Sequence, residues 1–153
     1  MSPQRQWLEL GDQFILDDAD WEVVEVLTVR GVRHSLRLAR VQPVLGGQPR
    51  LLLQTEDALF EAAPAPRENF DETVAHLDAR SYRRQWSGEA NIERARANAN
   101  RRFGRGTCIW YAAEDGSVAL VIDDTDQQAV VGTPLAPARL DLSFTDPSRG
   151  GRD

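Results

Sequence analysis

Arginine side chains are concentrated in one stretch of this 153-residue chain. Residues 80–105, called the Arg-rich segment below, hold eight of the eighteen basic residues and only two acids, and the chain has no lysine. A guanidinium group offers five donors in a planar fork that matches phosphate and carboxylate oxygens. Aromatic rings among the arginines would add a stacking surface for bases. The candidate binding residues are Arg80, Arg83, Arg84, Arg94, Arg96, Arg101, Arg102, Arg105, Tyr82 and Trp86.

Charge is unevenly distributed along the chain. The Arg-rich segment carries a net charge of +6, residues 1–79 carry −7 and residues 106–153 carry −5. Three explanations are open: the arginines pair with the flanking acids or keep one face solvated, they contact an acidic protein partner, or they bind nucleic acid or anionic lipid headgroups. The acidic blocks favour the first explanation. A pI near 5.0 also argues against a dedicated nucleic-acid binder, because such domains are usually basic.

The remaining reactive side chains form no catalytic or metal-binding motif. His34 and His76 are the only histidines and lie far apart in sequence, without the spacing of a zinc site. Cys108 is the only cysteine, so no disulfide can form within the chain, and its apolar neighbours predict a buried, inert thiol. Gly104 and Gly106 lack the spacing of a phosphate-binding loop and are predicted to let the chain turn into a strand.

Carboxylates cluster at residues 17–20, 56–57 and 123–126. The last cluster could supply oxygen ligands to Ca²⁺ or Mg²⁺, but it lacks the glycine and the closing glutamate of an EF-hand loop. Adjacent acids after a strand are typical of a solvated turn. We therefore predict no catalytic residues, no metal site and no cofactor, and the protein is expected not to be an enzyme.

The ends of the chain show no targeting signal. The N-terminal residues contain no apolar stretch of the kind found in signal peptides, and no apolar run is long enough to span a membrane. We therefore expect a cytoplasmic protein without membrane insertion. Residues 146–153 contain no large apolar side chain and are expected to form a disordered tail.

Short apolar runs separated by turns predict a mainly β protein. In the first half, strands are expected at residues 14–16, 21–30 with a bulge, 33–41, 51–53 and 58–62. The spacing is typical of a small antiparallel barrel or of rolled sheets in two halves, with at most one or two short helices. In the second half, Asp115-Gly116 between two β-rich runs predicts a hairpin with a type I′ turn, and further strands are expected at residues 129–131 and 140–144.

These elements suggest a division of the chain. Residues 1–62 would form an N-terminal β subdomain, residues 63–79 a linker with a short helix over 69–79, and residues 80–145 a C-terminal β subdomain that includes the Arg-rich segment. A single domain is the alternative. The Arg-rich segment itself is ambiguous, because Ile92, Ala95, Ala99 and Phe103 would share one face of a helix, while alternation around Ala90 and Ile92 fits a strand.

Segments from both halves of the chain together resemble a bacterial family, the domain of unknown function 4178 (DUF4178). Residues 8–26 and 37–62 resemble its opening strands, and residues 81–94, 115–124 and 130–142 resemble its later part, so the likeness covers about residues 8–144. The resemblance implies a small mainly β fold, a strand over residues 88–97 and an accessory role beside membrane- or stress-related bacterial proteins. The family supplies no catalytic residues to carry over.

Three hypotheses about function follow. The first is a bacterial accessory or binding module that acts through protein–protein contacts, with a partner that presents an acidic surface. The second is a single-stranded nucleic-acid-binding protein that uses the Arg-rich segment. The third is a small enzyme that uses carboxylates or a bound metal ion.

Overall fold

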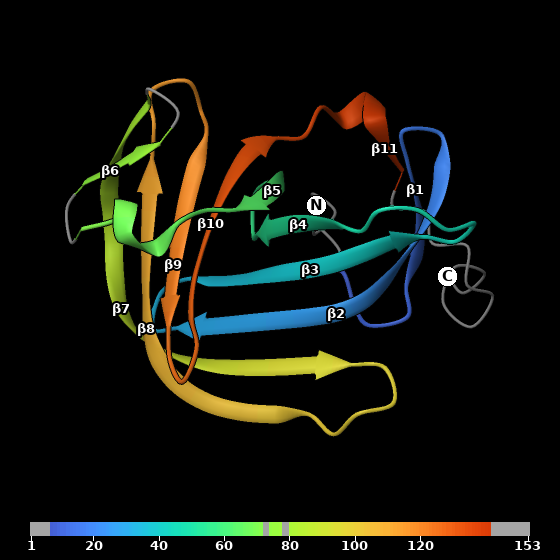
Figure 1. The fold of residues 1–153 in the computed structure, drawn as a ribbon, viewed down its shortest axis with the longest axis horizontal. Helices are drawn as coiled ribbons and strands as arrows, with labels where there is room; N and C mark the ends of the chain where they lie inside the picture. Colours follow the sequence, from blue (N-terminus) through green and yellow to red (C-terminus); the bar gives the residue numbers. More distant parts are fainter. Residues whose placement is uncertain (1–6, 72–73, 78–79, 142–153) are drawn as a thin grey trace, which may run out of the picture.

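The computed structural model describes residues 7–71, 74–77 and 80–141. In these residues the chain forms strands and two short 3-10 turns, η1 (Arg67–Asn69) and η2 (Pro137–Arg139), as Figure 1 shows. The strands are β1 (Gln13–Leu16), β2 (Ala19–Gly31), β3 (Ser35–Pro43), β4 (Arg50–Thr55), β5 (Leu59–Pro64), β6 (Val74–Leu77), β7 (Arg80–Arg96), β8 (Arg102–Ala112), β9 (Val118–Asp123), β10 (Gln127–Pro134) and β11 (Leu140–Asp141). The prediction of a mainly β protein is confirmed.

Eight of these strands close into an antiparallel barrel. Strands β2 to β5 form one consecutive meander and strands β7 to β10 form another. Two seams join the meanders: β5 pairs with β10, and the second half of β2 pairs with β7 from Glu25↔Arg96 to Gly31↔Ala90. Strands from both predicted halves therefore contribute to the same barrel.

The barrel interior is filled by one apolar cluster to which every barrel strand contributes. Alternate residues of a strand point to opposite faces of the sheet, so each strand sends every second side chain inward. Strand β9 shows this plainly, because Val118, Leu120 and Ile122 point inward. Its other side chains, Ala119 and Val121, belong to a separate cluster on the outside. The run of apolar residues in this strand is therefore explained by burial on both faces.

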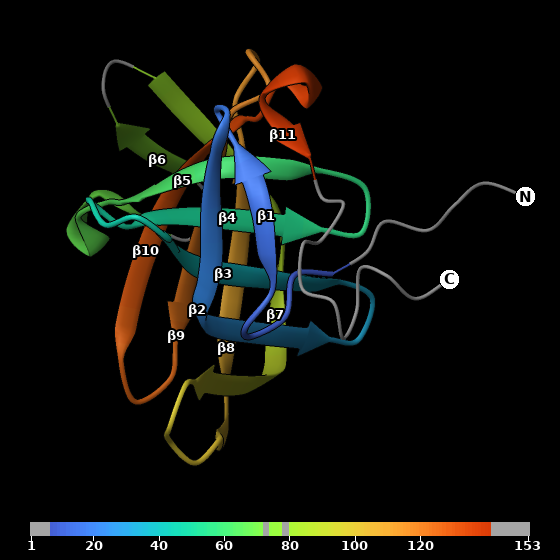
Figure 2. The same cartoon turned by 90° about the vertical axis from the view of Figure 1, so that its right-hand side faces the viewer.

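Two apolar clusters lie outside the barrel. The first packs Phe14 and Leu16 of β1 against β2, β3 and β4, and Figure 2 shows β1 in front of the barrel strands. The second packs Phe70, just after η1, against Tyr82 and Tyr111. The Phe70 and Tyr111 rings are 5.4 Å apart. Each cluster gives a barrel wall a second buried face.

The hairpins agree with the sequence predictions, but one turn type differs. The β2 bulge lies between Val23 and Glu25, as expected for a long strand that changes its phase. Asp17 and Asp18 both have positive φ, 51° and 62°, which is the pattern of a type I′ turn between β1 and β2. At the β8–β9 hairpin only Gly116 has positive φ, so the predicted type I′ turn there is wrong. Ala113 instead accepts a hydrogen bond from the amide of Gly116, closing a longer loop.

The predicted short helix over residues 69–79 is also wrong. Only Arg67–Asn69 form a 3-10 turn, and Val74–Leu77 form strand β6, which pairs with the start of β7. The amide of Val74 bonds to the Asp71 carboxylate, which turns the chain back toward this strand. Pairing with the free edge of β7 thus outweighs the local helical spacing. The predicted strand 140–144 begins as β11, and its residues 142–144 lie outside the described part of the chain, as does the predicted tail 146–153.

No helix among the residues described is both long and apolar enough to cross a membrane.

Candidate functional site

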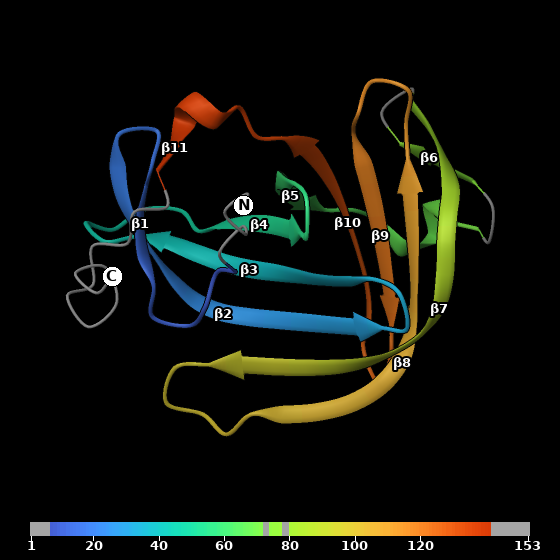
Figure 3. The same cartoon turned by 180° about the vertical axis from the view of Figure 1, so that it is seen from behind.

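The Arg-rich segment forms the longest hairpin of the barrel. Strand β7 and the first residues of strand β8, Arg102 to Arg105, come from it, and the two strands pair from Arg83↔Ala112 to Arg94↔Arg102. Residues 88–96 therefore form a strand, as expected for residues 88–97, and the alternative of a helix is wrong. Because neighbouring residues of a strand point to opposite faces, the arginines are divided between the two faces of the sheet. Figure 3 shows the Ala97–Arg101 turn at the lower end of the molecule, beside β2.

One arginine of the segment is held inside the protein by an aspartate. Arg94 donates to both oxygens of Asp124, at 2.5 and 3.2 Å. The side chains are only 18% and 4% exposed. The Arg94 guanidinium lowers the pKa of Asp124, and the carboxylate in turn raises the pKa of Arg94. This pair is the internal neutralisation expected from the acidic flanks.

Two further arginines of the segment meet acids near the surface. Arg80 lies 3.0 Å from Asp115. Arg101 lies 2.8 Å from Glu93, which Arg30 of β2 also approaches at 3.5 Å. These arginine side chains are about half exposed or more, so the pairs are screened by water and each contributes little to stability. The two cations around Glu93 leave this part of the surface positive.

Five arginines of the segment make no ion pair with any described residue. They fall into two groups at opposite ends of β7, and all five are exposed. The two groups are Arg83 and Arg84 near β6, and Arg96, Arg102 and Arg105 near the β7–β8 turn. The structure therefore separates the predicted site residues instead of gathering them into one surface.

The end of the hairpin, residues 94–105, contains five arginines and no acid. Phe103 lies there opposite Glu93 in the sheet and is 76% exposed. Arg105 is two residues further along the same face of β8. A hollow of about 310 Å³ lies beside Phe103 and is lined by Arg30, Glu93 and Arg105 among others. An exposed aromatic ring is thus surrounded by guanidinium groups.

The two aromatic candidates of the sequence do not form a surface for bases. Tyr82 is 2% exposed and packs in the outer apolar cluster. Trp86 is half-buried and stacks with His34 at 4.4 Å and with Trp110 at 6.1 Å. Phe60 lies 6.0 Å from Trp110. Since Tyr82 is buried and Trp86 stacks against other rings, neither supplies the platform for bases that the nucleic-acid hypothesis assigned to them.

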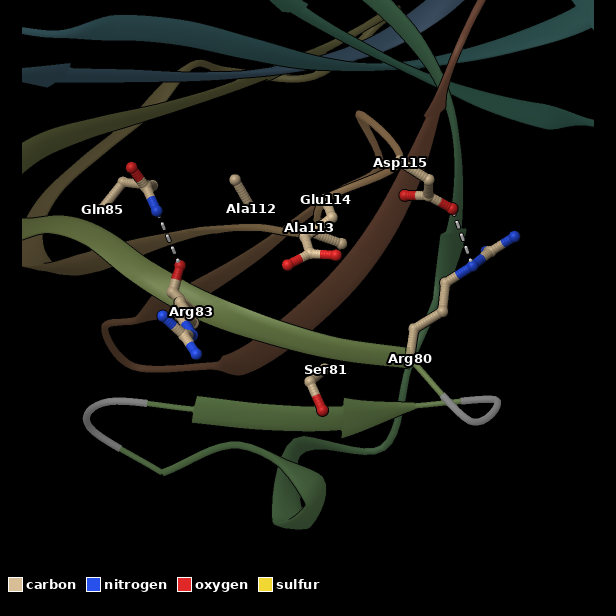
Figure 4. Close-up of a pocket in the computed structure, with 8 residues that line it drawn as sticks. All are labelled: Arg80, Ser81, Arg83, Gln85, Ala112, Ala113, Glu114 and Asp115. Atoms are coloured by element: carbon tan, nitrogen blue, oxygen red, sulfur yellow. Dashed lines mark hydrogen bonds and ion pairs between the residues drawn. The ribbon is translucent and has the colours of Figure 1, made fainter.

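A pocket of about 550 Å³ lies between the start of strand β7 and the β8–β9 loop. Figure 4 shows Arg80 reaching Asp115 across its rim, with Arg83 and Glu114 on its walls. The side-chain amide of Gln85 donates to the carbonyl oxygen of Arg83 at 3.3 Å. The pocket is open and of mixed charge.

A second pocket, of about 670 Å³, lies between the β2–β3 turn and β7. Arg33 and His34 form one wall, and the β7 residues from Gln85 to Ala90 form the other. Val29 and Cys108 lie at its base, where the barrel interior begins. This pocket was not predicted, because its two walls are about 50 residues apart in the sequence.

The carboxylates of the 123–126 cluster are used within the fold. Arg67 donates to both oxygens of Asp123 at 3.2 and 2.8 Å, and Asp124 is held by Arg94. Asp17, from the first acidic cluster, binds Arg139 at 2.7 Å and Arg50 at 2.9 Å, and these hydrogen bonds lower its pKa. In the described part of the chain no three His, Cys, Asp or Glu side chains come together as metal ligands.

The predicted turn at Gly104 and Gly106 is wrong, because both glycines lie inside strand β8. A Cβ atom at Gly106 would lie 2.8 Å from the Cβ of Asp124 and closer still to the carbonyl oxygen of Asp123. At Gly104 an added Cβ would meet no atom within 4 Å. Gly106 is therefore needed for the approach of β8 to the end of β9, whereas Gly104 is not.

Cys108 is expected to resist thiol reagents in the folded protein. Its side chain is 1% exposed, and burial raises its pKa to about 12, so the reactive thiolate is absent near neutral pH. We expect native protein to react with a disulfide reagent at pH 8 at least about 100-fold more slowly than the chain in denaturant, since reaction must await opening of the barrel. Stoichiometric labelling within minutes in native buffer would contradict this burial.

Comparison with known protein families, curated proteins and solved structures finds no match for this chain.

Proposed function

We propose that the protein is a non-enzymatic binding module that contacts an acidic surface of another protein through the end of the β7–β8 hairpin. The observation that carries this proposal is the 76% exposed Phe103, which lies two residues from Arg105 on the same face, and Arg105 forms no ion pair with a described residue. Aromatic residues and arginine are enriched at protein interfaces, where a few such side chains supply most of the binding free energy.

The surrounding charges select the kind of partner. Arg30 and Arg101 share the single carboxylate of Glu93, and Arg105 in the same hollow forms no ion pair with a described residue, so arginines outnumber acids around Phe103. Arg96 and Arg102, which also form no ion pair with a described residue, add positive charge on the opposite face of the hairpin. A partner with an apolar recess rimmed by carboxylates fits this surface, and its approach would be accelerated by the opposite charge.

Nucleic-acid binding has less support from the structure. The hairpin end keeps the cations that a phosphate backbone needs, but Tyr82 is buried and Trp86 stacks against other rings, which leaves Phe103 as the one exposed ring of the Arg-rich segment on which a base could stack. Fluorescence anisotropy with a single-stranded oligonucleotide at two salt concentrations tests this alternative. Tight binding that weakens steeply with salt would favour it over a protein partner.

The proposal predicts that Phe103→Ala weakens partner binding at least about ten-fold without lowering stability, because the ring is exposed and centrally placed. Proteins captured by the wild type should also be lost from the triple variant R96E/R102E/R105E. The partner is then purified, and its affinity for each variant is measured by calorimetry.

The triple variant R33E/R83E/R84E is the matched control. It removes three other exposed arginines that form no ion pair with a described residue, and it changes the net charge by the same amount. Equal loss of the partner from both triple variants would show that only overall charge matters. Retention of the partner by both F103A and R96E/R102E/R105E would overturn the proposed function.

A further inference from the structure

Strand β7 has a stretch of edge without a strand partner. Strand β8 pairs with one edge of β7 from Arg83 to Arg94, with a bulge between Arg84 and Trp86. On the other edge, β6 pairs with residues 80–83 and β2 pairs with residues 90–96. Within the chain as described, no strand pairs with residues 84–89 on this side, and we call this stretch the β7 edge. It lies where the barrel seam ends and before the outer strand begins.

The β7 edge is exposed along its length. All of its residues are exposed except the half-buried Trp86. Successive residues of a strand direct their backbone N–H and C=O groups to opposite edges, so about half of these groups point away from β8. Such an edge is a template for a further strand, and extended peptides are commonly bound in this way.

Gly88 in the middle of the β7 edge is not required by the fold. Its φ is not in the left-handed region, and a Cβ added there would meet no atom within 4 Å. Gly88 lies opposite Cys108 in the sheet and therefore faces the barrel side, toward the pocket of about 670 Å³. A glycine inside a strand costs stability and often marks the close approach of another backbone or a ligand.

The charges around the β7 edge are mostly positive. Arg33 lies on the opposite wall of the pocket, and Arg83 and Arg84 lie at the β6 end, one on each face of the strand. None of the three forms an ion pair with a described residue. Glu89 is the one acid among the described residues that line this pocket. The surroundings therefore favour an acidic segment.

We propose that the β7 edge binds an extended acidic peptide segment of a partner protein, which adds to the sheet as a strand. An apolar side chain of the peptide enters the pocket beside Gly88, Ala90 and Cys108, and its carboxylates meet Arg33, Arg83 and Arg84. The stacked rings of His34 and Trp86 give that pocket a firm wall. This site is separate from the hairpin end and does not depend on it.

A second copy of the chain is the competing occupant. Antiparallel self-pairing about residues 86 and 87 would set Arg84 opposite Glu89 of the other copy. However, the edge forms one wall of a pocket whose other wall is the β2–β3 turn. Two such recessed edges would have to bring both turns into the same space, whereas a single extended peptide needs only the pocket.

The test uses the full-length protein and one defined probe at pH 7, the acetylated and amidated heptapeptide Glu-Glu-Glu-Val-Glu-Glu-Glu, whose extended form places carboxylates on both faces around one apolar side chain. Titration followed by amide NMR should shift resonances of residues 84–89 and of the 31–34 turn, and hydrogen exchange should show new protection along the β7 edge. The same peptide with alternate amides N-methylated should bind at least about ten-fold more weakly, because main-chain hydrogen bonds carry strand addition. A peptide with lysine in place of glutamate should also bind at least about ten-fold more weakly.

Matched variants locate the binding. Gly88→Val should weaken binding about ten-fold or more by filling the space above Cys108, whereas Gly104→Val, in the neighbouring strand and equally free of contacts, should leave it unchanged. R33E/R83E/R84E should lose the peptide and R96E/R102E/R105E should keep it, which is the reverse of the pattern expected for the hairpin partner. The two proposals can therefore fail independently.

Thermal unfolding first establishes that each variant is folded. No shift at the β7 edge with millimolar peptide would overturn the proposal, as would equal binding of the N-methylated peptide. A concentration-dependent dimer that Gly88→Val abolishes would assign the edge to a second copy instead. Unchanged peptide binding by both Gly88→Val and R33E/R83E/R84E would place the peptide elsewhere.

Discussion

Replacing Arg94 by methionine should lower the free energy of unfolding by about 3 kcal/mol at pH 7. The change leaves the Asp124 carboxylate, whose side chain is 4% exposed, without the guanidinium that binds both of its oxygens. The amide of Asp126 would still donate to it. Urea unfolding of the purified variant measures the loss.

Two further variants separate the buried charge from other effects. Adding Asp124→Asn to Arg94→Met should recover more than half of the lost stability, because the amide carries no charge and can still accept from Asp126. Arg101→Met removes an exposed pair instead and should cost less than about 1 kcal/mol. An Arg94→Met loss no larger than that of Arg101→Met would contradict the importance of the buried pair.

The effect of Arg94→Met should depend on pH. In the wild type the pKa of Asp124 is lowered, so the folded state binds fewer protons than the unfolded state and this aspartate stabilises the fold above its unfolded pKa of about 3.9. This contribution is lost as the pH falls through the folded-state pKa. In the variant, burial without the cation raises the pKa, so stability falls as pH rises. The deficit at about pH 4.5 should therefore be smaller than at pH 7.

Replacing Gly106 by alanine should destabilise the protein by about 3 kcal/mol. The new Cβ would collide with the backbone of Asp123 and lie 2.8 Å from the Cβ of Asp124, so β8 and the end of β9 would have to separate. The same shift would strain the adjacent Arg94–Asp124 pair. Thermal and urea unfolding measure the change.

Gly104→Ala is the control for this prediction, because the two glycines lie on the same face of β8. An added Cβ at Gly104 meets nothing within 4 Å, so the variant should be unchanged or more stable by up to about 1 kcal/mol. Equal stability of the two variants would show that β8 and β9 adjust without cost and that Gly106 is not required.

The sequence predicted most strands because their side chains alternate or their ends carry turn residues. The helix predicted over residues 69–79 failed because the edge of β7 offered Val74–Leu77 a partner that local spacing does not reveal. The same long-range pairing decided the Arg-rich segment, where β2 and β8 hold Ile92 in the barrel interior from both sides. Where local spacing allowed either a helix or a strand, pairing with neighbouring strands of the sheet decided which one formed.

The candidate sites could be predicted from the sequence less completely than the fold. The charge distribution predicted that acids of the flanking blocks would form ion pairs with some of the arginines, and Asp115 and Asp124 do so. Which arginines remain unpaired depends on the face and register of each strand, and these follow from the closed barrel. Gly88 was the one visible signal of the β7 edge, since a glycine without a turn role in a strand is unusual.

The two seams of the barrel also bear on how the chain reaches its native state. Each four-stranded meander forms from local hairpins, but β2 meets β7 only across about 60 residues of intervening chain. Loop closure over such distances is slow, and folds with many distant pairings have high contact order and fold in milliseconds to seconds. Until the seams form, the first meander emerging from the ribosome has two open edges and half of an apolar interior. Chaperones or early pairing with the second meander would have to protect it from aggregation.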